Sequence, residues 1–363
     1  MNYRLATILN KEAHGSDITK VIDLNLSDPV SQFVIIHEPY NGSQIFADGH
    51  PAKCITKIEL VDGSDVIYSL SGMQAQAVDW YHRKQEPLNV MLYLNNNPSI
   101  MIFNMNFGRH LWDTQLAFDP KKFVNPQLKI TIDVDAGGSA TDNGWLTVIA
   151  HIFDEKVVTP TGFLMHKLIK DYALGASSHE YTDLPTDYPF RKLFIAGYVP
   201  GTGIEAVFEN LKLSEDNDRK IPFDHQINQV LQTIIGQTRP YREWIIGPGT
   251  TTAEYFYCTP TYWPAFGSSQ WRSAVADCQI AIYGGDGGRF TEDQGAAGPN
   301  WQTLVEGWVP HGVLEFPFGM QDDPTDWYDV TKLGSLILDL LAGGGMSSSE
   351  SAQIFLQQYR VYA

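Results

Sequence analysis

Apolar and polar positions in the first half of the chain alternate with a period of two. Runs such as SQFVIIHEPY, NVMLYLN, SIMIFNMNF, QLKITIDVD and WLTVIAHIF follow one another, and turn-forming stretches such as NNNP and AGGSATDNG separate them. This alternation is typical of short strands with one buried face. The second half resumes it with KLFIAGYVP, IEAVFENLKL, EYFYCTP and SLILDLLAGG. The pattern predicts an all-β protein.

One stretch, from Ile58 to Tyr81, predicts a hairpin followed by a helix. Its sequence is IELVDGSDVIYSLSGMQAQAVDWY, and the DGS triplet between two apolar runs is a hairpin signal. Ser71 is a favourable N-cap, and Ala75 and Val78 follow at helical spacing. We therefore expect one well-defined helix in the first half.

Two weaker helical patterns lie elsewhere. Leu5, Ile8 and Leu9 would form one apolar face of a short amphipathic helix near the N-terminus. A second short helix is predicted over Phe163–Tyr172, at the start of a Pro-containing passage that reads as a linker over 159–189.

The hairpin–helix pattern occurs twice. A segment starting at Leu211 aligns without a gap with the one starting at Ile58, at an offset of 211 − 58 = 153. Ser71 then falls on Asp224, and both are suitable N-caps. A second matched pair, FGRHLWDT and FGMQDDPT, leads in each half to a strand that ends close to AGG. The same elements in the same order indicate an internal duplication.

The two matched helices are expected to cover one end of each half. Val78 in the first helix and Val230 or Leu231 in the second should point inward. Exposed sheet edges and ends need such covering.

About eight strand candidates and one helix in each half fit an eight-stranded antiparallel sandwich, the jelly roll. The predicted fold is two tandem jelly rolls, a double jelly roll, each with one short helix. The predicted parts are an N-terminal arm at 1–30, a first roll at 31–158, a linker at 159–189, and a second roll at 190–363 with a long inserted loop at about 247–311.

Composition narrows the range of functions. A formal net charge of −17 disfavours nucleic-acid binding over a broad face. Cys54, Cys258 and Cys278 are too few and too widely spaced for a disulfide framework or a zinc site, so we expect free buried thiols. The N-terminal sequence lacks the apolar core of a signal peptide, and no apolar run approaches the roughly 20 residues of a membrane span. Folding in a cytoplasm is expected.

No arrangement of residues predicts catalysis, a metal or a cofactor. The pairs His151 with Asp154 and His110 with Asp113 lack a third zinc ligand. GGDGG lacks the lysine of a phosphate-binding loop, and DVDAGGSATDNG lacks the spacing of a calcium loop, so both read as turns. No G-x-S-x-G elbow is present.

Two segments carry a family resemblance. ITKIELVDGSDVIYSLSGMQAQAVDWY and FNMNFGRHLWDTQLAFDPKKFVNPQLKITID resemble the double jelly-roll major capsid proteins of tailless icosahedral viruses, in particular the bacteriophage members of the adenovirus-hexon lineage. The resemblance covers roughly Ser31 to Ala363. The second copy has Met320 where the first has Arg109, so the repeat does not support a role for Arg109.

This resemblance implies a structural role without enzymatic activity. It implies a homotrimer with a pseudo-hexameric outline that contacts neighbouring capsomers, penton proteins and minor capsid proteins in the virion, after synthesis in the host cytoplasm. It also makes the N-terminal arm a candidate for contact with an internal lipid membrane. No cofactor is implied.

Six side chains are candidates for assembly or surface-loop contacts: Arg4, Lys11, Arg109, Trp263, Trp271 and Trp301. Two other functions stay open because the long second-half loop is rich in aromatic residues. One is a two-jelly-roll hydrolase that acts on glycans, and the other is a sugar-binding spike or lectin.

Overall fold

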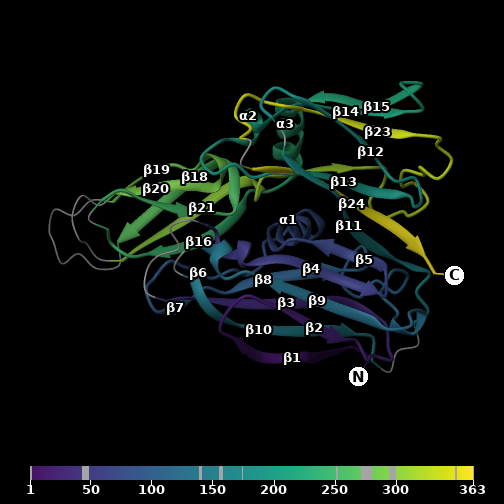
Figure 1. The fold of residues 1–363 in the computed structure, drawn as a ribbon, viewed down its shortest axis with the longest axis horizontal. Coiled ribbons are helices and arrows are strands. Elements are labelled where there is room, and N and C mark those ends of the chain that lie inside the picture. The colour runs from purple at the N-terminus through teal and green to yellow at the C-terminus, as the bar shows by residue number, and fades with distance from the viewer. Residues whose placement is uncertain are drawn as a thin grey trace.

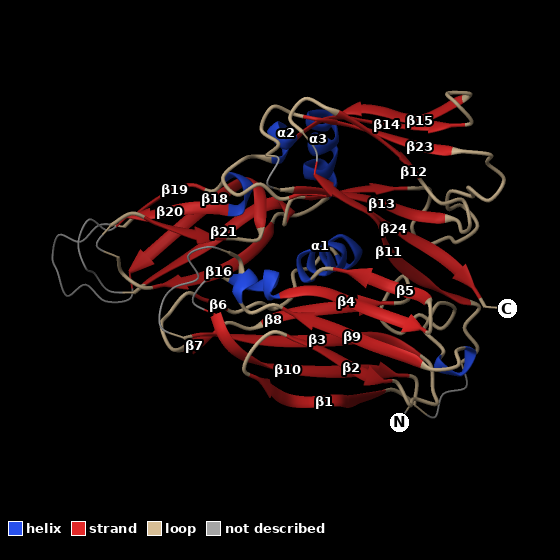
Figure 2. Cartoon of the chain, viewed as in Figure 1, coloured by secondary structure: helices blue, strands red, loops and turns tan. Residues whose placement is uncertain are grey.

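A computed structural model describes residues 2–42, 49–138, 141–154, 158–173, 175–250, 252–270, 280–293, 300–347 and 350–362. The chain is built mainly from strands, in three parts that Figure 1 and Figure 2 show. A first roll lies at the bottom of the view, a second roll at the top right, and a smaller strand-rich unit projects to the left.

The first roll is a sandwich of two antiparallel sheets. One sheet has the order β1-β10-β3-β8, and the other has the order β2-β9-β4-β5. The strands of the first sheet are β1 (Arg4–His14), β3 (Val30–Asn41), β8 (Met101–Asn106) and β10 (Thr141–Ile152), with the short β7 (Asn97–Pro98) also on β3. Those of the second are β2 (Ile18–Asp23), β4 (Ile55–Asp62), β5 (Asp65–Leu70) and β9 (Pro126–Ile132).

The second roll repeats this topology strand for strand. Its sheets have the orders β11-β24-β13-β22 and β12-β23-β14-β15. The first sheet contains β11 (Gly162–Ala173), β13 (Phe190–Gly197), β22 (Val313–Pro317) and β24 (Ser351–Val361). The second contains β12 (His179–Asp183), β14 (Phe208–Glu215), β15 (Lys220–Gln226) and β23 (Leu336–Ala342). Two eight-stranded jelly rolls in tandem confirm the predicted fold class.

The rolls are joined edge to edge. β5 of the first roll pairs in parallel with β11 of the second through the pairs His166 with Tyr68 and Lys167 with Ser69. One eight-stranded sheet, β2-β9-β4-β5-β11-β24-β13-β22, therefore runs through both rolls.

The predicted helix is confirmed as α1 (Gly72–Arg83), and its N-terminus has a capping box. The Ser71 hydroxyl accepts the Gln74 N–H, and the Gln74 side chain accepts the Ser71 N–H. α1 lies between β5 and β8, and its counterpart α3 (Ile227–Gln237) lies between β15 and β22. Val78, Val230 and Leu231 are buried, as predicted.

The two helices differ in their surroundings. α1 lies between the first roll and the β13-β22 side of the second, so almost every residue from Gly72 to Tyr81 is buried. α3 is amphipathic: it packs on β14 and β15 with one face and exposes the polar residues of the other. The sequence predicts that both helices cover one end of a sandwich. α1 does more than this, because it also packs against the second roll and lies between the two rolls.

The gapless alignment of the repeat is wrong by two residues after the hairpin. β4 and β5 are joined by Gly63-Ser64, whereas β14 and β15 are joined by the four-residue turn Asp216–Arg219. The longer turn moves the N-cap of α3 from Asp224 to Gln226. Asp224 lies in β15 instead, where its carboxylate accepts a hydrogen bond from the Asn210 amide at 2.8 Å.

Both weaker helix predictions are wrong. The segment that contains Leu5, Ile8 and Leu9 is strand β1, and Phe163–Tyr172 lies in strand β11. Each uses its backbone N–H and C=O groups in a ladder, β1 with β10 and β11 with β24. Pairing with a strand that is distant in sequence overrides the local helical spacing.

The predicted arm and the predicted linker both contain strands. The predicted arm 1–30 contains β1 and β2, and the predicted linker 159–189 contains β11 and β12. Where one domain ends and the next begins stays a prediction.

The predicted inserted loop is largely a folded unit, and we call residues 241–310 the inserted unit. One of its sheets, β18-β21-β16-β6, recruits a short strand from the first half, and the other is β17-β20-β19. Its strands are β16 (Tyr241–Gly247), β17 (Glu254–Tyr257), β18 (Pro260–Gln270), β19 (Ala281–Gly284), β20 (Arg289–Asp293) and β21 (Trp301–Pro310), joined by β6 (Met91–Leu92). Aromatic and β-branched residues in the segment favour strand pairing over an open loop.

The remaining elements are short. They are α2 (Ile204–Val207), η1 (Pro51–Cys54), η2 (Pro120–Lys122), η3 (Asp135–Gly137) and η4 (Asp286–Gly288).

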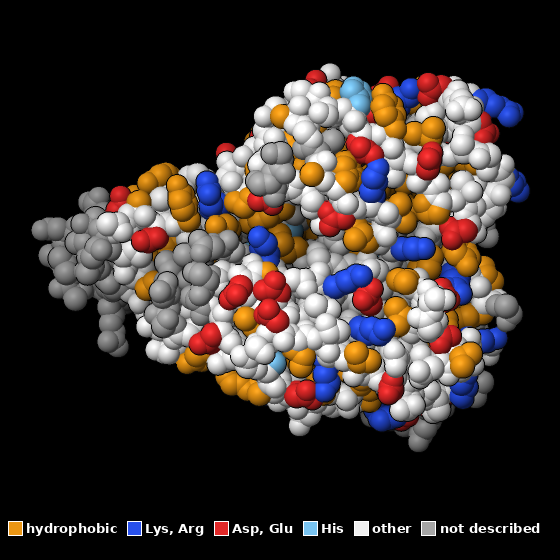
Figure 3. Space-filling model, viewed as in Figure 1, with side chains coloured by type: hydrophobic (Ala, Val, Ile, Leu, Met, Phe, Trp, Pro, Cys, Tyr) orange, Lys and Arg blue, Asp and Glu red, His pale blue; other side chains and the backbone are white. Residues whose placement is uncertain are grey.

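Cys54 and Cys258 are free and buried, as expected, and Cys278 lies outside the described residues. On the face shown in Figure 3, acidic and basic side chains are interspersed rather than gathered by sign.

Candidate functional site

The contact between the two rolls contains a network of buried polar side chains. We call the surface where α1 meets β13, β22 and β24 the seam. The Tyr81 hydroxyl donates a hydrogen bond to the Val313 carbonyl at 2.8 Å. The Gln74 amide donates to the Gln353 side chain on β24 at 2.5 Å. A helix of the first roll is thus bound along the sheet β11-β24-β13-β22 of the second roll.

A group of buried charges lies at the C-terminal end of α1. Lys192 on β13 forms an ion pair with Glu315 on β22, and both side chains are buried. Lys84, just after α1, approaches the same carboxylate at 3.3 Å. Burial lowers the pKa of Lys192 to about 8 and that of Arg191 to about 10, although Glu315 raises both. One carboxylate therefore compensates several cations.

Arg191 is held by neutral acceptors. Its Nη1 donates to the Gln357 side-chain oxygen at 2.9 Å and to His82 Nδ1 at 3.1 Å. Gln357 in turn contacts His166 Nε2 at 2.7 Å. Burial and then the nearby cations lower the pKa of His82 and of His166, to about 3 for His166, so both imidazoles are neutral acceptors. Buried polar groups that are paired in this way define one relative placement of the two rolls.

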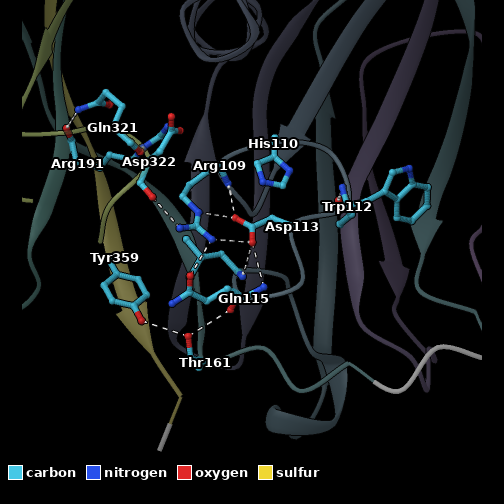
Figure 4. Close-up of polar contacts among 12 residues, drawn as sticks. Arg109, His110, Trp112, Asp113, Gln115, Thr161, Arg191, Gln321, Asp322 and Tyr359 are labelled. Atoms are coloured by element: carbon cyan, nitrogen blue, oxygen red, sulfur yellow. Dashed lines mark hydrogen bonds and ion pairs between the residues drawn. The ribbon is translucent and has the colours of Figure 1, made fainter. Parts of the chain in front are cut away.

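Arg109 forms a second link between the rolls (Figure 4). Its Nε and Nη2 bind both oxygens of Asp113, at 2.7 and 3.0 Å, and Nη2 also donates to Gln115 at 2.8 Å. Its Nη1 donates to the carbonyl oxygen of Asp322 at 2.8 Å. Burial tends to raise the pKa of Asp113, but hydrogen bonds from Arg109 lower it to about 2. The guanidinium thus joins the segment after β8 to the segment after β22.

The Phe-Gly sequence occurs at the same tight backbone turn in both rolls, and that turn requires glycine. The N–H of Arg109 donates to Asp113 at 3.1 Å, and the N–H of Met320 donates to Asp326 at 2.7 Å. A Cβ on Gly319 would lie 2.1 Å from the Asp326 carbonyl oxygen, and one on the equivalent glycine of the first roll would also clash. The backbone turn is duplicated, whereas the guanidinium link belongs to the first copy alone.

The two basic candidates near the N-terminus are paired within the chain. Arg4 Nε lies 3.1 Å from Asp154, and Lys11 Nζ lies 2.8 Å from Glu38. Both lie on β1, which is hydrogen-bonded to β10. As partner contacts they stay predictions.

The three aromatic candidates of the inserted unit have different positions. Trp263 is 58% exposed at a left-handed backbone position with φ 47°, and its ring stacks on Tyr262 at 5.1 Å. Trp301 is fully buried and meets Phe256 edge-on at 4.9 Å, which contradicts its expected role as a surface contact. The core between the two small sheets needs a large apolar residue there. Trp271 lies outside the described residues.

Other candidate chemistries find local explanations. His151 stacks on Trp112 with ring centroids 5.5 Å apart, and Asp133 accepts the N–H groups of Asp135 and Ala136 in a turn. Within the described ranges no group of three or more His, Cys, Asp or Glu residues is arranged to hold a metal ion. In the same part of the chain, no helix is both long and apolar enough to span a bilayer.

Sequence reasoning missed the buried ions of the seam. Arg191 and Lys192 stand at the start of an apolar run, where charges usually mark the exposed end of a strand. The partner of Lys192, Glu315, is 123 positions further along the chain. Nothing in the local pattern signals a pairing at that separation.

Comparisons with known proteins support the fold. No protein-family model matches the sequence, and no curated protein matches it. Among solved structures, the STIV major capsid protein superimposes with a TM-score of 0.61 at 10% identity, over 99% of this chain and 97% of that one. Major capsid protein P2 of bacteriophage PM2 gives 0.56 at 10% identity, over 99% and 98%.

VP54 of PBCV-1 gives a TM-score of 0.56 at 10% identity, over 99% of this chain and 94% of that chain. These matches include both rolls and the inserted unit. Identity this low carries the fold and nothing finer. The chain therefore has the double jelly-roll fold of these viral major capsid proteins.

Proposed function

We propose that the chain is the major capsid protein of an icosahedral virus and works as a structural component of the virion without catalysis. The observation that carries this is the match of the whole chain, both rolls together, to several major capsid proteins. A single jelly roll serves many functions. Two rolls locked by a buried ionic seam form a rigid block of the kind that a shell requires.

The proposed assembly is a trimer in which three chains place six rolls in a ring. The tandem repeat supports it. Inside the chain, the α1 side of the first roll binds the outer face of the sheet β11-β24-β13-β22. The equivalent α3 side of the second roll and the equivalent outer face of β1-β10-β3-β8 have no such partner among the described residues. Head-to-tail pairing of these two surfaces would close a ring.

The α3 side of the second roll contains a cleft into which side chains of a neighbouring chain could insert. A cleft of about 540 Å³ lies between α3, β15 and β22. Its apolar lining is Phe223, Val230, Ile234, Phe316 and Phe318. The last turn of α1 carries the buried Trp80 and Tyr81, whereas the last turn of α3 has Ile235 and Gly236. On the opposite surface, Val34, Ile36 and Trp145 are only half-buried.

Contacts with penton proteins, minor capsid proteins and an internal membrane remain further proposals. The membrane contact would involve the first strand, whose Leu5 is 62% exposed.

The test is the solution mass of the purified chain together with negative-stain microscopy. We expect particles of three copies of 40.7 kDa, about 122 kDa, with a hexagonal outline. Thr233→Trp fills the cleft and should shift the protein to monomer, whereas Asn228→Trp, on the same helix but away from the cleft, should not. If the wild-type chain stays monomeric when the protein concentration is raised about 100-fold, the proposal is wrong.

A further inference from the structure

A buried carboxylate lies where the inserted unit meets the rolls. Glu243 on β16 is 6% exposed. Its two oxygens accept the N–H of Thr259 at 2.6 Å and the Thr259 hydroxyl at 2.9 Å. No ion pair with a cation is formed by Glu243 in the described part of the chain, because the neighbouring Arg242 points outward to Glu306 at 2.9 Å.

The hydrogen bonds continue from Glu243 into the first roll. The Thr259 hydroxyl also contacts His50 Nε2 at 3.2 Å, and His50 lies in the loop before η1. The Ala52 N–H donates to His50 Nδ1 at 3.1 Å, so the proton of the neutral ring must be on Nε2. His50 therefore donates to Thr259, and Thr259 donates to Glu243.

A second imidazole is fixed beside the first. The rings of His50 and His311 are perpendicular, with centroids 4.8 Å apart. His311 Nε2 lies 2.9 Å from the side-chain oxygen of Gln76 in α1. The Gln76 nitrogen already donates to Asn89 and to the Ile102 carbonyl, so its oxygen must be an acceptor. His311 thus carries its proton on Nε2, and its buried Nδ1 has no partner within the described chain.

Neither imidazole can take up a second proton in place. A proton on His50 Nδ1 would face the Ala52 N–H and break that bond. A proton on His311 Nδ1 would bury an unpaired charged donor. Burial accordingly lowers the pKa of both rings, to about 3 for His311. Other ionisable groups that face these residues are Lys53, Tyr93, Tyr198, Tyr241, Cys258 and Glu350.

We call Glu243, Thr259, His50, His311 and Gln76 the joint. We propose that the joint is an acid-sensitive latch, in which protonation of His50 and His311 breaks the contact between the Thr259 segment of the inserted unit and the first roll. The joint connects the inserted unit, the first roll and the turn before β22, and the parallel pairing of β6 with β16 is a second connection between the inserted unit and the first half of the chain. Its opening would let the segment around Thr259 move relative to the first roll, while the β6–β16 pairing still holds the inserted unit and the seam holds the rolls together.

Glu243 opposes this release. Burial raises the pKa of Glu243 to about 7, so in the closed joint it takes up a proton at a higher pH than an exposed glutamate would. Between pH 6.5 and 5 each imidazole should increase the open fraction about 15-fold, whereas Glu243 should decrease it about 20-fold. The wild-type joint should therefore open about tenfold more at pH 5 than at pH 6.5.

The test is hydrogen–deuterium exchange of the full chain at pH 8, 6.5 and 5, corrected for intrinsic exchange rates. Peptides over 49–54 and 254–262 report the joint, and peptides over 190–197 in β13 report the seam. Glu243→Gln should steepen the acid opening to about 200-fold between pH 6.5 and 5. His311→Gln, which keeps a donor for Gln76, should nearly abolish the opening.

Glu292→Gln is the matched control. Glu292 is also a buried carboxylate of the inserted unit, but it bonds to Thr250 and lies outside the joint. This variant should reproduce the wild-type profile at the joint. The proposal is overturned if Glu243→Gln and Glu292→Gln give the same profile, or if peptides over the joint and the seam open together at every pH.

Discussion

Removal of the Glu315 charge tests whether the seam is held as the geometry indicates. Among the described residues, Glu315 forms ion pairs with both Lys192 and Lys84, and Arg191 lies next to Lys192 in the chain. Glu315→Gln keeps the shape of the side chain and removes its charge. The buried Lys192 is then left without a counter-ion.

The expected magnitude follows from burial. The Lys192 and Glu315 side chains are 5% and 7% exposed. Removal of one partner from such a pair destabilises a protein by about 3–5 kcal/mol, because a desolvated charge is left behind. Lys192→Met should cost less, about 1–3 kcal/mol, since Glu315 keeps the half-exposed Lys84 at 3.3 Å.

The assay is urea unfolding followed by tryptophan fluorescence. The slope of the unfolding free energy against urea concentration is compared between the variants and the wild type. Lys332→Met is the control, because Lys332 is 85% exposed and its ion pair with Asp329 should contribute less than about 0.5 kcal/mol. If Lys192→Met proves more destabilising than Glu315→Gln, the assignment of Lys84 as a second partner is wrong. If neither Glu315→Gln nor Lys192→Met changes the free energy of unfolding, the ion pairs of the seam do not contribute to the stability of the fold.

Three further predictions use the same unfolding assay. Ser71→Ala removes one half of the capping box of α1 and should cost about 1 kcal/mol; a neutral result would mean that packing alone fixes the helix start. Gly319→Ala should cost about 2 kcal/mol or more, because φ is 64° and the new Cβ would clash with the Asp326 carbonyl, whereas Gly236→Ala on exposed α3 should stabilise by up to about 1 kcal/mol. Burial raises the pKa of Glu292 from 4.5 to about 7, so stability should fall as pH rises between these values, and Glu292→Gln should flatten that slope.

Local pattern predicted the repeated unit because its signals are short-range. The alternation of apolar residues, the turn at Gly63 and the cap at Ser71 each act within a few positions, and all three are present in the structure. The same logic failed for the segments at Leu5 and at Phe163. There the competing interaction is a strand more than 100 residues away in the chain.

The register of the second copy shows a finer limit. An alignment without gaps placed the helix cap at Asp224, but a turn longer by two residues moved it to Gln226. Insertions in surface turns cost little free energy, so sequence similarity alone does not locate them.

By itself the sequence determined the all-β class, the duplication and the position of the helix in each half. These follow from periodicity and from caps that each segment carries alone. Only the tertiary structure decided that α1 lies between the rolls, that Glu315 compensates Lys192, and that Thr259 links Glu243 to His50. Such pairings depend on which distant surfaces fold together, and a buried charge has the same local sequence signature as an exposed one.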